Sequence, residues 1–313
     1  MSDVRLGTVA VLGAGLVGTS IGLVLRKHGI SVTLADRDPE SVAAAVRRGA
    51  GRASTPDEPP ADLAVLAVPP AAVPAVLLRA QADRVAEWYT DVADVKTAPS
   101  TAARRLGCDM TSFVPGHPVG GREHSGAAVA SGSLFGGKSW VLCPEEETAD
   151  EAVRVVRELI ALCEAIPVVM SAAEHDDALA LVSHTPHLVA GAMAAALFGA
   201  EHRTLRLGGA GVWDVTRVAE GDPALWTEIL TQNARGVATV LSEIAANLTD
   251  VAAALQLAGE GDGSFIGDVT ELLTLGAAGR RDLVETVVLD PARLPAPSAD
   301  LLPPVNPTAR QQA

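Results

Sequence analysis

The residues best placed to do chemistry are a histidine beside glycines in the first half of the chain and a second group in the other half. His117 opens the run 117–126, which contains three glycines and follows a strand predicted at 112–115. Ligands of open α/β sheets lie where strands end, and an imidazole can take up a proton near neutral pH. An isolated histidine is more often structural, but this position favours function. We predict that His117 is a general base in a reachable loop.

The second group lies further along the chain, in a region of helical periodicity. His184 and His187 are three residues apart, so a helix would place them on one face. The glycine-rich run 208–211 leads towards Arg217, whose guanidinium can bind a carboxylate through two hydrogen bonds. Paired histidines also suggest a metal, but a catalytic zinc needs a third ligand and the sequence offers none nearby. We predict a small anionic substrate and no metal.

The run Gly13–Gly18 has the spacing G-x-G-x-x-G between a predicted strand at 8–12 and a predicted helix at 16–28. In this context Gly13 permits a tight turn, Gly15 admits a pyrophosphate, and Gly18 lets the helix pack on the sheet. The backbone N–H groups of Leu16 and Val17 begin the helix and face the phosphates. The pattern predicts a dinucleotide cofactor.

Asp36 ends the second predicted strand, 31–35, where a carboxylate would bind the adenosine ribose. It would repel the 2′-phosphate of NADP, so NAD is favoured. Arg37 beside it keeps NADP open as an alternative.

Alternating strands and helices must position these residues. Helices are predicted at 40–49 and 148–165, and further strands at 63–68, 88–92, 139–143 and 166–170, a pattern typical of a parallel sheet. The stretches 173–199, 222–257 and 264–287 show helical periodicity alone. We expect an α/β fold: a Rossmann domain over 1–171, an all-α domain over 172–290, and a proline-rich, disordered tail over 291–313.

Composition narrows the function. The 313 residues include 24 basic and 38 acidic side chains, a net charge of −14, which argues against nucleic-acid binding. Cys108, Cys143 and Cys163 lack metal or redox spacing and are expected to be buried thiols. Residues 1–5 leave no room for a signal peptide, and no apolar run of membrane-spanning length lacks Gly, Pro or charge. We therefore expect a cytoplasmic protein.

Taken together, these segments resemble the prephenate dehydrogenase family, which includes arogenate and cyclohexadienyl dehydrogenases. The resemblance covers about residues 6 to 287 and depends on five ordered motifs: Gly13–Gly18, Asp91–Lys96, His117–Gly126, Ser183–His187 and Asp214–Arg217. It implies a Rossmann domain and a helical domain that forms a homodimer. Because the sequence shows no further catalytic or regulatory module, we expect a monofunctional enzyme. The implied reaction is hydride transfer from C4 of a cyclohexadiene to NAD with loss of the ring carboxylate as carbon dioxide.

The resemblance also implies roles for individual residues. His117 would bind the C4 substituent and remove its proton, and Arg217 would bind a substrate carboxylate. His187 would line the site near the substrate side chain, with His175 in support. Trp226 would reach into the partner subunit's site, and Glu123 would be a polar residue behind those that touch substrate.

One position departs from the family pattern in a way that bears on the substrate. The family usually has a serine that touches the C4 hydroxyl, whereas this chain has Asp94 in the run Asp91–Lys96. A carboxylate there suits an ammonium group, which predicts 4-amino-4-deoxyprephenate as substrate and 4-aminophenylpyruvate as product. Prephenate remains an even alternative, because Asp94 could accept a bond from the hydroxyl or face Lys96. Arogenate, with an alanyl side chain, is also open.

Two other classes compete with this interpretation. The β-hydroxyacid dehydrogenases also join a Rossmann domain to a helical one, but they use a lysine of the helical domain, and this chain has none after Lys138. An NAD-sensing regulator would account for the glycine motif but not for His117, His187 and Arg217 together. Both are less favoured than a dehydrogenase of the prephenate family.

Overall fold

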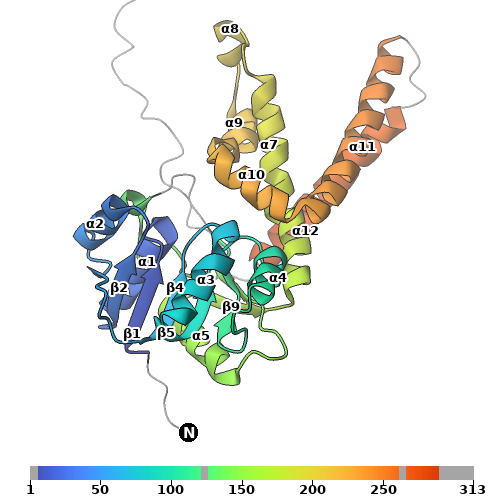
Figure 1. The fold of residues 1–313 in the computed structure, drawn as a ribbon. Coiled ribbons are helices and arrows are strands. Elements are labelled where there is room, and N and C mark those ends of the chain that lie inside the picture. Colours follow the sequence, from blue (N-terminus) through green and yellow to red (C-terminus); the bar gives the residue numbers. More distant parts are fainter. Residues whose placement is uncertain (1–5, 121–125, 261–265, 289–313) are drawn as a thin grey trace, which may run out of the picture.

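The first half of the chain forms a parallel six-stranded sheet in a computed structural model that describes residues 6–120, 126–260 and 266–288 (Figure 1). Its strand order is β3-β2-β1-β4-β5-β6, with every neighbouring pair parallel. The strands are β1 (Thr8–Leu12), β2 (Ser31–Ala35), β3 (Arg52–Ala53), β4 (Ala61–Leu66), β5 (Ala86–Asp91) and β6 (Phe113–Val114). This order reverses beside β1, which is where a doubly wound sheet binds its ligand.

Helices cover both faces of this sheet, and alternate residues of each strand feed the two cores. Val9 and Val11 of β1 pack in the core beneath α1 (Leu16–Lys27) and α5 (Asp150–Leu162). Ala10 between them packs in the opposite core, beneath α3 (Val73–Ala82) and α4 (Thr97–Arg105). The predicted Rossmann architecture is confirmed. Helix α2 (Pro39–Arg47) follows β2, and short 3₁₀ turns lie at Pro70–Ala72 (η1) and Ala127–Val129 (η2).

A second sheet of three strands corrects the expectation of one continuous parallel sheet. Its order is β7 (Gly116–Pro118), β8 (Ser139–Leu142) and β9 (Ile166–Val169), with β7 antiparallel to β8. His117 lies in β7 opposite Val141, not in a loop, and is only 4% exposed. A short run of Gly, His and Pro has weak intrinsic strand character, so pairing with β8 determines its conformation.

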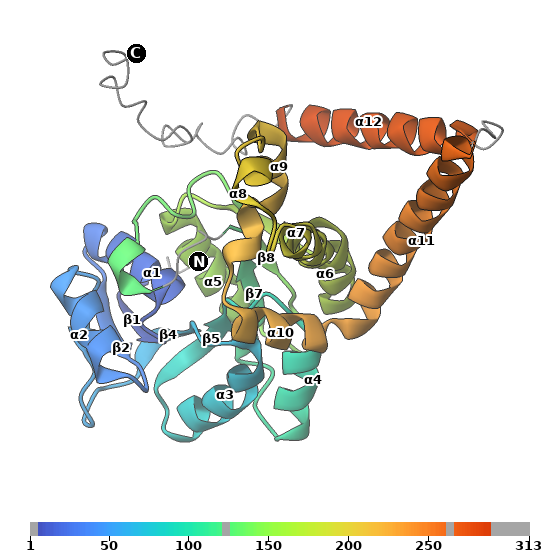
Figure 2. The same cartoon turned by 90° about the horizontal axis from the view of Figure 1, so that it is seen from above.

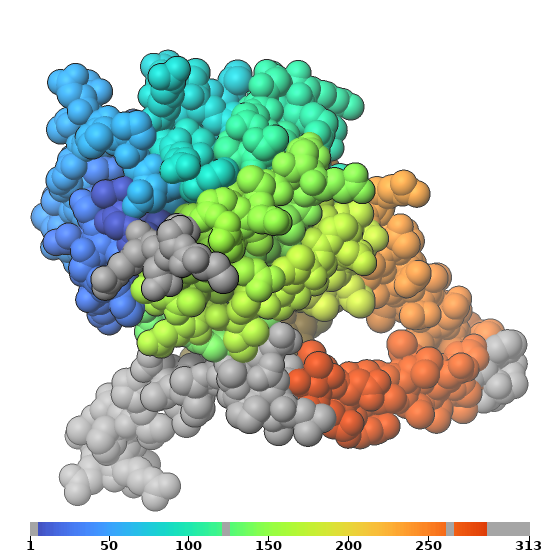
Figure 3. All heavy atoms as spheres, turned by 90° about the horizontal axis from the view of Figure 1, so that it is seen from below, coloured from blue at the N-terminus to red at the C-terminus, as the bar shows by residue number. Residues whose placement is uncertain are grey.

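From residue 172 onwards the described chain is helical, as predicted. The elements are α6 (Ala172–Leu179), a π-helix η3 (Ala180–His184), α7 (Thr185–Ala196), α8 (His202–Leu205), α9 (Ala210–Thr216), a 3₁₀ turn η4 (Arg217–Glu220), α10 (Pro223–Gln232), α11 (Ala234–Gly259) and α12 (Ile266–Val288). Figure 2 shows α11 extending away from the rest of the molecule and α12 running back from the far end of α11. Figure 3 shows an opening between these two helices and the rest of the molecule.

The helical half exposes many large apolar side chains. Phe198 is 95% exposed, Leu207 85%, and Leu273 on α12 69%. Within the described residues, two stretches are long and apolar enough to cross a bilayer by length and composition, Ala172–Ala196 and Ala234–Gly259. That test is also passed by helices that pack against protein, so it carries little weight by itself.

Candidate active site

The glycine turn after β1 has the geometry that a dinucleotide needs. Gly13 has φ +114° and donates its N–H to Ala35 at 2.7 Å, which joins the turn to β2. A Cβ on Gly18 would lie 2.0 Å from the Gly13 carbonyl oxygen, so the helix can approach the strand only with glycine there. A Cβ on Gly15 would meet nothing within 4 Å. The space beside Gly15 is therefore open to a ligand, next to the start of α1 where Leu16 and Val17 lie.

Asp36 holds the neighbouring part of this site. Its Oδ2 accepts the Ala14 N–H at 2.7 Å and its Oδ1 accepts the Asp38 N–H at 2.9 Å. Asp36 also borders a cavity of about 610 Å³ between the end of β2, α2 and β3, and the side chain of Arg37 is exposed. An open glycine turn, a helix start and a pocket beside an acidic residue fit an adenine dinucleotide.

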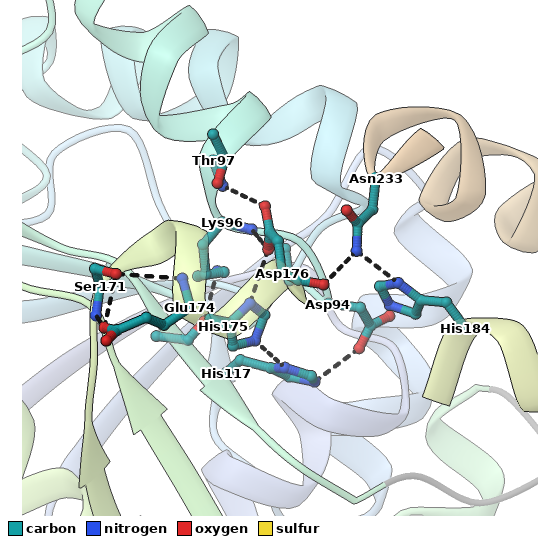
Figure 4. A network of polar contacts seen from close by, with 12 residues as sticks. Asp94, Lys96, Thr97, His117, Ser171, Glu174, His175, Asp176, His184 and Asn233 are labelled. Carbon is teal, nitrogen blue, oxygen red and sulfur yellow. Dashed lines mark hydrogen bonds and ion pairs between the residues drawn. The ribbon is translucent and has the colours of Figure 1, made fainter. Parts of the chain in front are cut away.

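Four side chains form a continuous line of hydrogen bonds where the two halves of the molecule meet (Figure 4). Asp94 Oδ1 lies 2.9 Å from His117 Nε2, and His117 Nδ1 lies 2.8 Å from His175 Nε2. His175 Nδ1 in turn lies 2.8 Å from Asp176 Oδ1. We call Asp94, His117, His175 and Asp176 the polar network. It joins a loop and strand of the sheet half to the first turns of α6.

The polar network requires more hydrogens than two neutral imidazoles carry. Three bonds need three hydrogens, and two neutral rings supply two. Burial disfavours the Asp94 carboxylate, but the hydrogen bond and charge of His117 outweigh it, so the pKa of Asp94 lies below its ordinary value. Asp94 is therefore ionised and can only accept, so its hydrogen bond with His117 requires a hydrogen on His117 Nε2.

Exposure differs sharply along the polar network. The Asp94 side chain is 44% exposed, whereas His117 is almost fully buried and His175 has no exposed surface. Burial, more than any other cause, lowers the pKa of His175, so this ring is neutral. The end of the network at Asp94 and His117 Nε2 is thus the end that a substrate can reach.

Lys96 and Asp91 hold the loop that carries Asp94. The Lys96 ammonium is 1% exposed, pairs with the Asp91 carboxylate, and donates to the Gly116 carbonyl at 2.7 Å. Asp91 also accepts the Gly116 N–H at 3.0 Å. Gly116 immediately precedes His117, so this buried ion pair fixes the base strand and the Asp94 loop together. The Lys96 ammonium therefore pairs with Asp91 and not with Asp94.

Two more histidines lie beside the polar network, on α7 and the π-helix before it. His184 is fully buried and its Nδ1 accepts from Asn233 Nδ2 at 3.1 Å, while its Nε2 has no protein partner among the described residues. Burial lowers the pKa of His184 to about 4. His187 stacks on Trp226 of the same chain, with ring centroids 3.6 Å apart and planes 11° apart. A π-helix often marks a functional position, and here it moves His184 inward.

The remaining predicted site residues do not belong to the polar network. Gly208 and Gly209 precede a helix, but the rest of the predicted glycine-rich loop is the short helix α9 instead. Arg217 follows it, is exposed, and opens η4, which packs against α7. The resemblance implied that Trp226 reaches a partner subunit, and within one chain it stacks on His187. Glu123 lies outside the described residues, as do residues 1–5 and the tail at 291–313.

Sequence reasoning missed Asp176 and Asn233. Asn233 Nδ2 donates to the Asp176 backbone carbonyl at 2.6 Å as well as to His184. Neither residue lies in a recognisable motif, and apart from the adjacent His175 the partners named here are 49 to 80 residues away in the sequence. The three cysteines, as predicted, are buried free thiols, and burial raises the pKa of both Cys143 and Cys163 to about 12.

Comparison with known proteins accounts for both halves. Residues 21–169 match the nucleotide-binding domain of prephenate dehydrogenase, and residues 171–266 match the dimerization domain of prephenate dehydrogenase. A probable prephenate dehydrogenase of Streptomyces niveus is 40% identical over 260 residues, which cover 82% of this chain and 71% of that protein. The chain belongs to the prephenate dehydrogenase family.

Other family members agree. The prephenate dehydrogenase of Bacillus subtilis is 31% identical over 72% of this chain and 64% of its own length. The crystal structure of the Aquifex aeolicus prephenate dehydrogenase, in complex with hydroxyphenyl propionate and NAD⁺, superposes with a TM-score of 0.77 at 25% identity. That superposition covers 90% of this chain and 100% of the other, so the Rossmann domain and the helical domain share the family's arrangement.

Proposed function

We propose that this protein uses NAD to oxidise and decarboxylate a prephenate-type cyclohexadiene, and that the ring carries an amino group at C4. The glycine turn, Asp36 and the adjacent cavity support the choice of NAD. When bound, NAD accepts the hydride from C4. The single observation that carries the substrate proposal is the 2.9 Å approach of Asp94 Oδ1 to His117 Nε2 at the exposed end of the polar network.

The two candidate substrates differ in their proton balance. In both, the C4–H bond breaks and its electron pair leaves as hydride, and the bond to the ring carboxylate breaks to release carbon dioxide and make the ring aromatic. A hydroxyl gives its proton to His117 and regains it as the phenol forms. An ammonium must lose one proton for good, because the product is a neutral aromatic amine. An amino substrate therefore needs a base and a route for a proton to leave.

The site fits an ammonium group because it presents two hydrogen-bond acceptors side by side. Once His117 Nε2 has lost its hydrogen, that nitrogen and the Asp94 carboxylate both accept. An ammonium can donate to both at once, whereas a hydroxyl can donate to one. Asp94 adds a charge-assisted bond, which is about twice as strong as a neutral one. Its 44% exposure also gives the released proton a path to solvent.

Prephenate is the second candidate, because the relatives described above are named prephenate dehydrogenases. With prephenate, Asp94 would accept the bond from the hydroxyl or stay paired with protonated His117. The second arrangement keeps a hydrogen on the base and slows turnover. Arogenate, which differs in its side chain, would meet the same C4 environment.

We further propose the supporting roles and the assembly. Arg217 binds a substrate carboxylate, His187 and Trp226 line the side-chain end, and Glu123 lies behind the contacting residues. The protein acts as a cytoplasmic homodimer through its helical half, because the second family model is a dimerization domain and that half exposes apolar side chains. We divide the chain at residue 171, with the helical domain over 172–290.

The test is NADH formation by purified protein with prephenate, arogenate and 4-amino-4-deoxyprephenate under identical conditions. We expect kcat/KM to be at least ~10-fold higher for the amino compound, which corresponds to about 1.4 kcal/mol of added transition-state binding. Equal or better turnover of prephenate would disprove the C4-amino proposal. Turnover of none of the three would disprove the reaction class.

A matched pair of variants tests whether Asp94 is responsible for the preference. Asp94→Ser should shift the ratio of kcat/KM towards prephenate, because a hydroxyl replaces the carboxylate. Asp94→Asn keeps the size but removes the charge, and should lower turnover of the amino compound more than that of prephenate. An unchanged ratio in both variants would show that Asp94 does not select the substituent.

A further inference from the structure

Asp176 is the point from which both the base and Asp94 are positioned. Its Oδ1 contacts His175 Nδ1 at 2.8 Å and accepts the Lys96 N–H at 2.8 Å, while its Oδ2 accepts the Thr97 N–H at 2.9 Å. The first contact leads through His175 to His117. The other two hold the backbone that immediately follows Asp94. One carboxylate at the start of α6 thus reaches both groups that face C4 (Figure 4).

The charge on Asp176 determines which nitrogen of each ring carries a hydrogen. Burial raises the pKa of Asp176, but hydrogen bonds from His175 and from the Lys96 and Thr97 backbone lower it by more. The pKa of Asp176 therefore lies below its ordinary value, and the group is ionised. A carboxylate accepts only, so His175 must donate from Nδ1. Its Nε2 then accepts, and His117 must donate from Nδ1. That leaves His117 Nε2 as the basic nitrogen, facing Asp94 and the substrate.

We propose that Asp176 is a positioning residue that aims the basic nitrogen of His117 at the C4 substituent and fixes Asp94 beside it. The inference rests on the proposed function, in which His117 is the base. It holds for an amino or a hydroxyl group at C4. The other titratable groups around the pair are Asp94 and Lys96 on the loop, Asp91 on β5 and His184 on the π-helix, and none of them contacts His175 Nδ1.

An asparagine at this position would reverse the order of donors and acceptors. With its amide nitrogen in the place of Oδ1, Asp176→Asn would donate to His175 Nδ1 and leave the Lys96 N–H without its acceptor, while the amide oxygen kept the Thr97 N–H. His175 would then donate from Nε2 to His117 Nδ1. His117 Nε2 would carry the hydrogen in the neutral ring and could not act as a base. Loss of the correct tautomer in a comparable pair of residues costs roughly 10⁴-fold in turnover.

Asp177 provides a matched control, because it is the next residue on α6 and is exposed. We expect Asp176→Asn to lower kcat by about 10²- to 10⁴-fold, the range for loss of general base catalysis. KM for NAD should stay within ~3-fold, since the glycine turn is separate. Asp177→Asn should change neither constant by more than ~2-fold. Equal effects of the two substitutions would overturn the proposal.

A double-mutant cycle separates positioning from general damage. If Asp176 acts through His117, then Asp176→Asn should cost little more in kcat once His117→Asn is present. Multiplicative losses in the double variant would mean that Asp176 acts independently of the base, and would overturn the proposal.

Nitrogen NMR of the imidazoles tests the inference without substrate, and therefore apart from the proposed function. The wild-type protein should show both His175 and His117 with a hydrogen on Nδ1, because His175 Nδ1 faces Asp176 and His117 Nδ1 faces His175. The opposite tautomer in either ring would refute the inference even if turnover of the amino compound were as expected. If wild-type protein oxidised none of the three substrates yet showed these tautomers, the proposed function would fail and the structural inference would stand.

Discussion

The sheet half and the helical half bury their side chains in different ways. The sheet half encloses two apolar cores made by alternate residues of the same strands. The helical half has few fully buried apolar residues among those described, and many large ones are exposed, on η3, α9, α11 and α12 above all. Its fully buried polar side chains are instead gathered at the junction with the sheet half: His175, Asp176, His184, Thr185 and Asn233.

The two halves therefore have different roles. The sheet half is stabilised by its own core and presents a preformed cofactor turn. The helical half contributes to chemistry only along its junction with the sheet, and the rest of its surface is suited to another subunit. Large apolar side chains gathered on a protein surface generally mark an interaction site, and residues 171–266 match a dimerization domain. The predictions that follow test each side of the contrast.

The largest effect should come from placing charges on the exposed apolar face of α12. We expect the double variant Ile266→Glu, Leu273→Glu to convert a dimer into a monomer, because these exposed side chains lie seven residues apart on one face of α12 and each subunit would bury two carboxylates in an apolar interface. Counting both subunits, the loss should exceed about 4 kcal/mol, or ~1000-fold in the dissociation constant. Sedimentation equilibrium measures it.

Leu106 at the end of α4 is the matched control in the sheet half, since its 51% exposure lies between the 46% of Ile266 and the 69% of Leu273. Leu106→Glu should leave the association state unchanged. A wild-type protein that is monomeric at all concentrations would contradict the assignment of this face to a dimer.

The next effect concerns two glycines of the cofactor turn that look alike in sequence. Gly18→Ala should destabilise the fold by about 3 kcal/mol, because its Cβ would lie 2.0 Å from the Gly13 carbonyl oxygen. Gly15→Ala meets no atom within 4 Å and should unfold at the same denaturant concentration as wild type. Its defect should be weaker NAD binding, measured by calorimetry. Full NAD affinity in Gly15→Ala would show that the cofactor does not pass over this glycine.

Much of the sheet half could be predicted from the sequence because its signals are local. A β-branched run, a glycine turn and Asp36 lie within 30 residues, so β1, α1 and β2 could each be recognised. The strand around His117 could not, since Gly116–Pro118 becomes a strand only by pairing with β8. Two of the three contacts in the polar network join residues that are 23 and 58 positions apart, and Asp176 also binds the Lys96 backbone 80 positions away. Nothing in the local sequence marks Asp176 as the anchor of the network.

Lowering the pH should reduce the free energy of unfolding mainly through His184, which the helical half contributes to the junction. The folded protein holds His184 neutral, with its pKa at about 4 against an ordinary 6.5 because of burial. The unfolded chain therefore binds more protons between these values, and stability falls as pH drops from about 6.5 towards 4. A shift of this size amounts to on the order of 3 kcal/mol. The free energy of unfolding, measured by denaturant titration at several pH values, checks it.

The matched variants are His184→Asn and His202→Asn, because His202 on α8 is exposed. The first should flatten part of the pH dependence, although burial lowers the pKa of His175 and His187 in the same direction. The second should leave the dependence unchanged. An identical acid limb in wild type and His184→Asn would mean that the His184 ring does not carry the linkage.

The smallest effect should come from a polar bond at the exposed edge of the junction. Glu228 on α10 accepts the Ala71 N–H of η1 at 2.7 Å, an exposed link between the halves that is not part of the polar network. Glu228→Ala should lower the free energy of unfolding by at most about 1 kcal/mol, because water can replace an exposed acceptor. Glu228→Gln keeps the oxygen and should be closer still to wild type. A loss of several kcal/mol in Glu228→Ala would mean that the halves are held together at this edge as strongly as at the polar network, and the junction would no longer depend chiefly on its buried side chains.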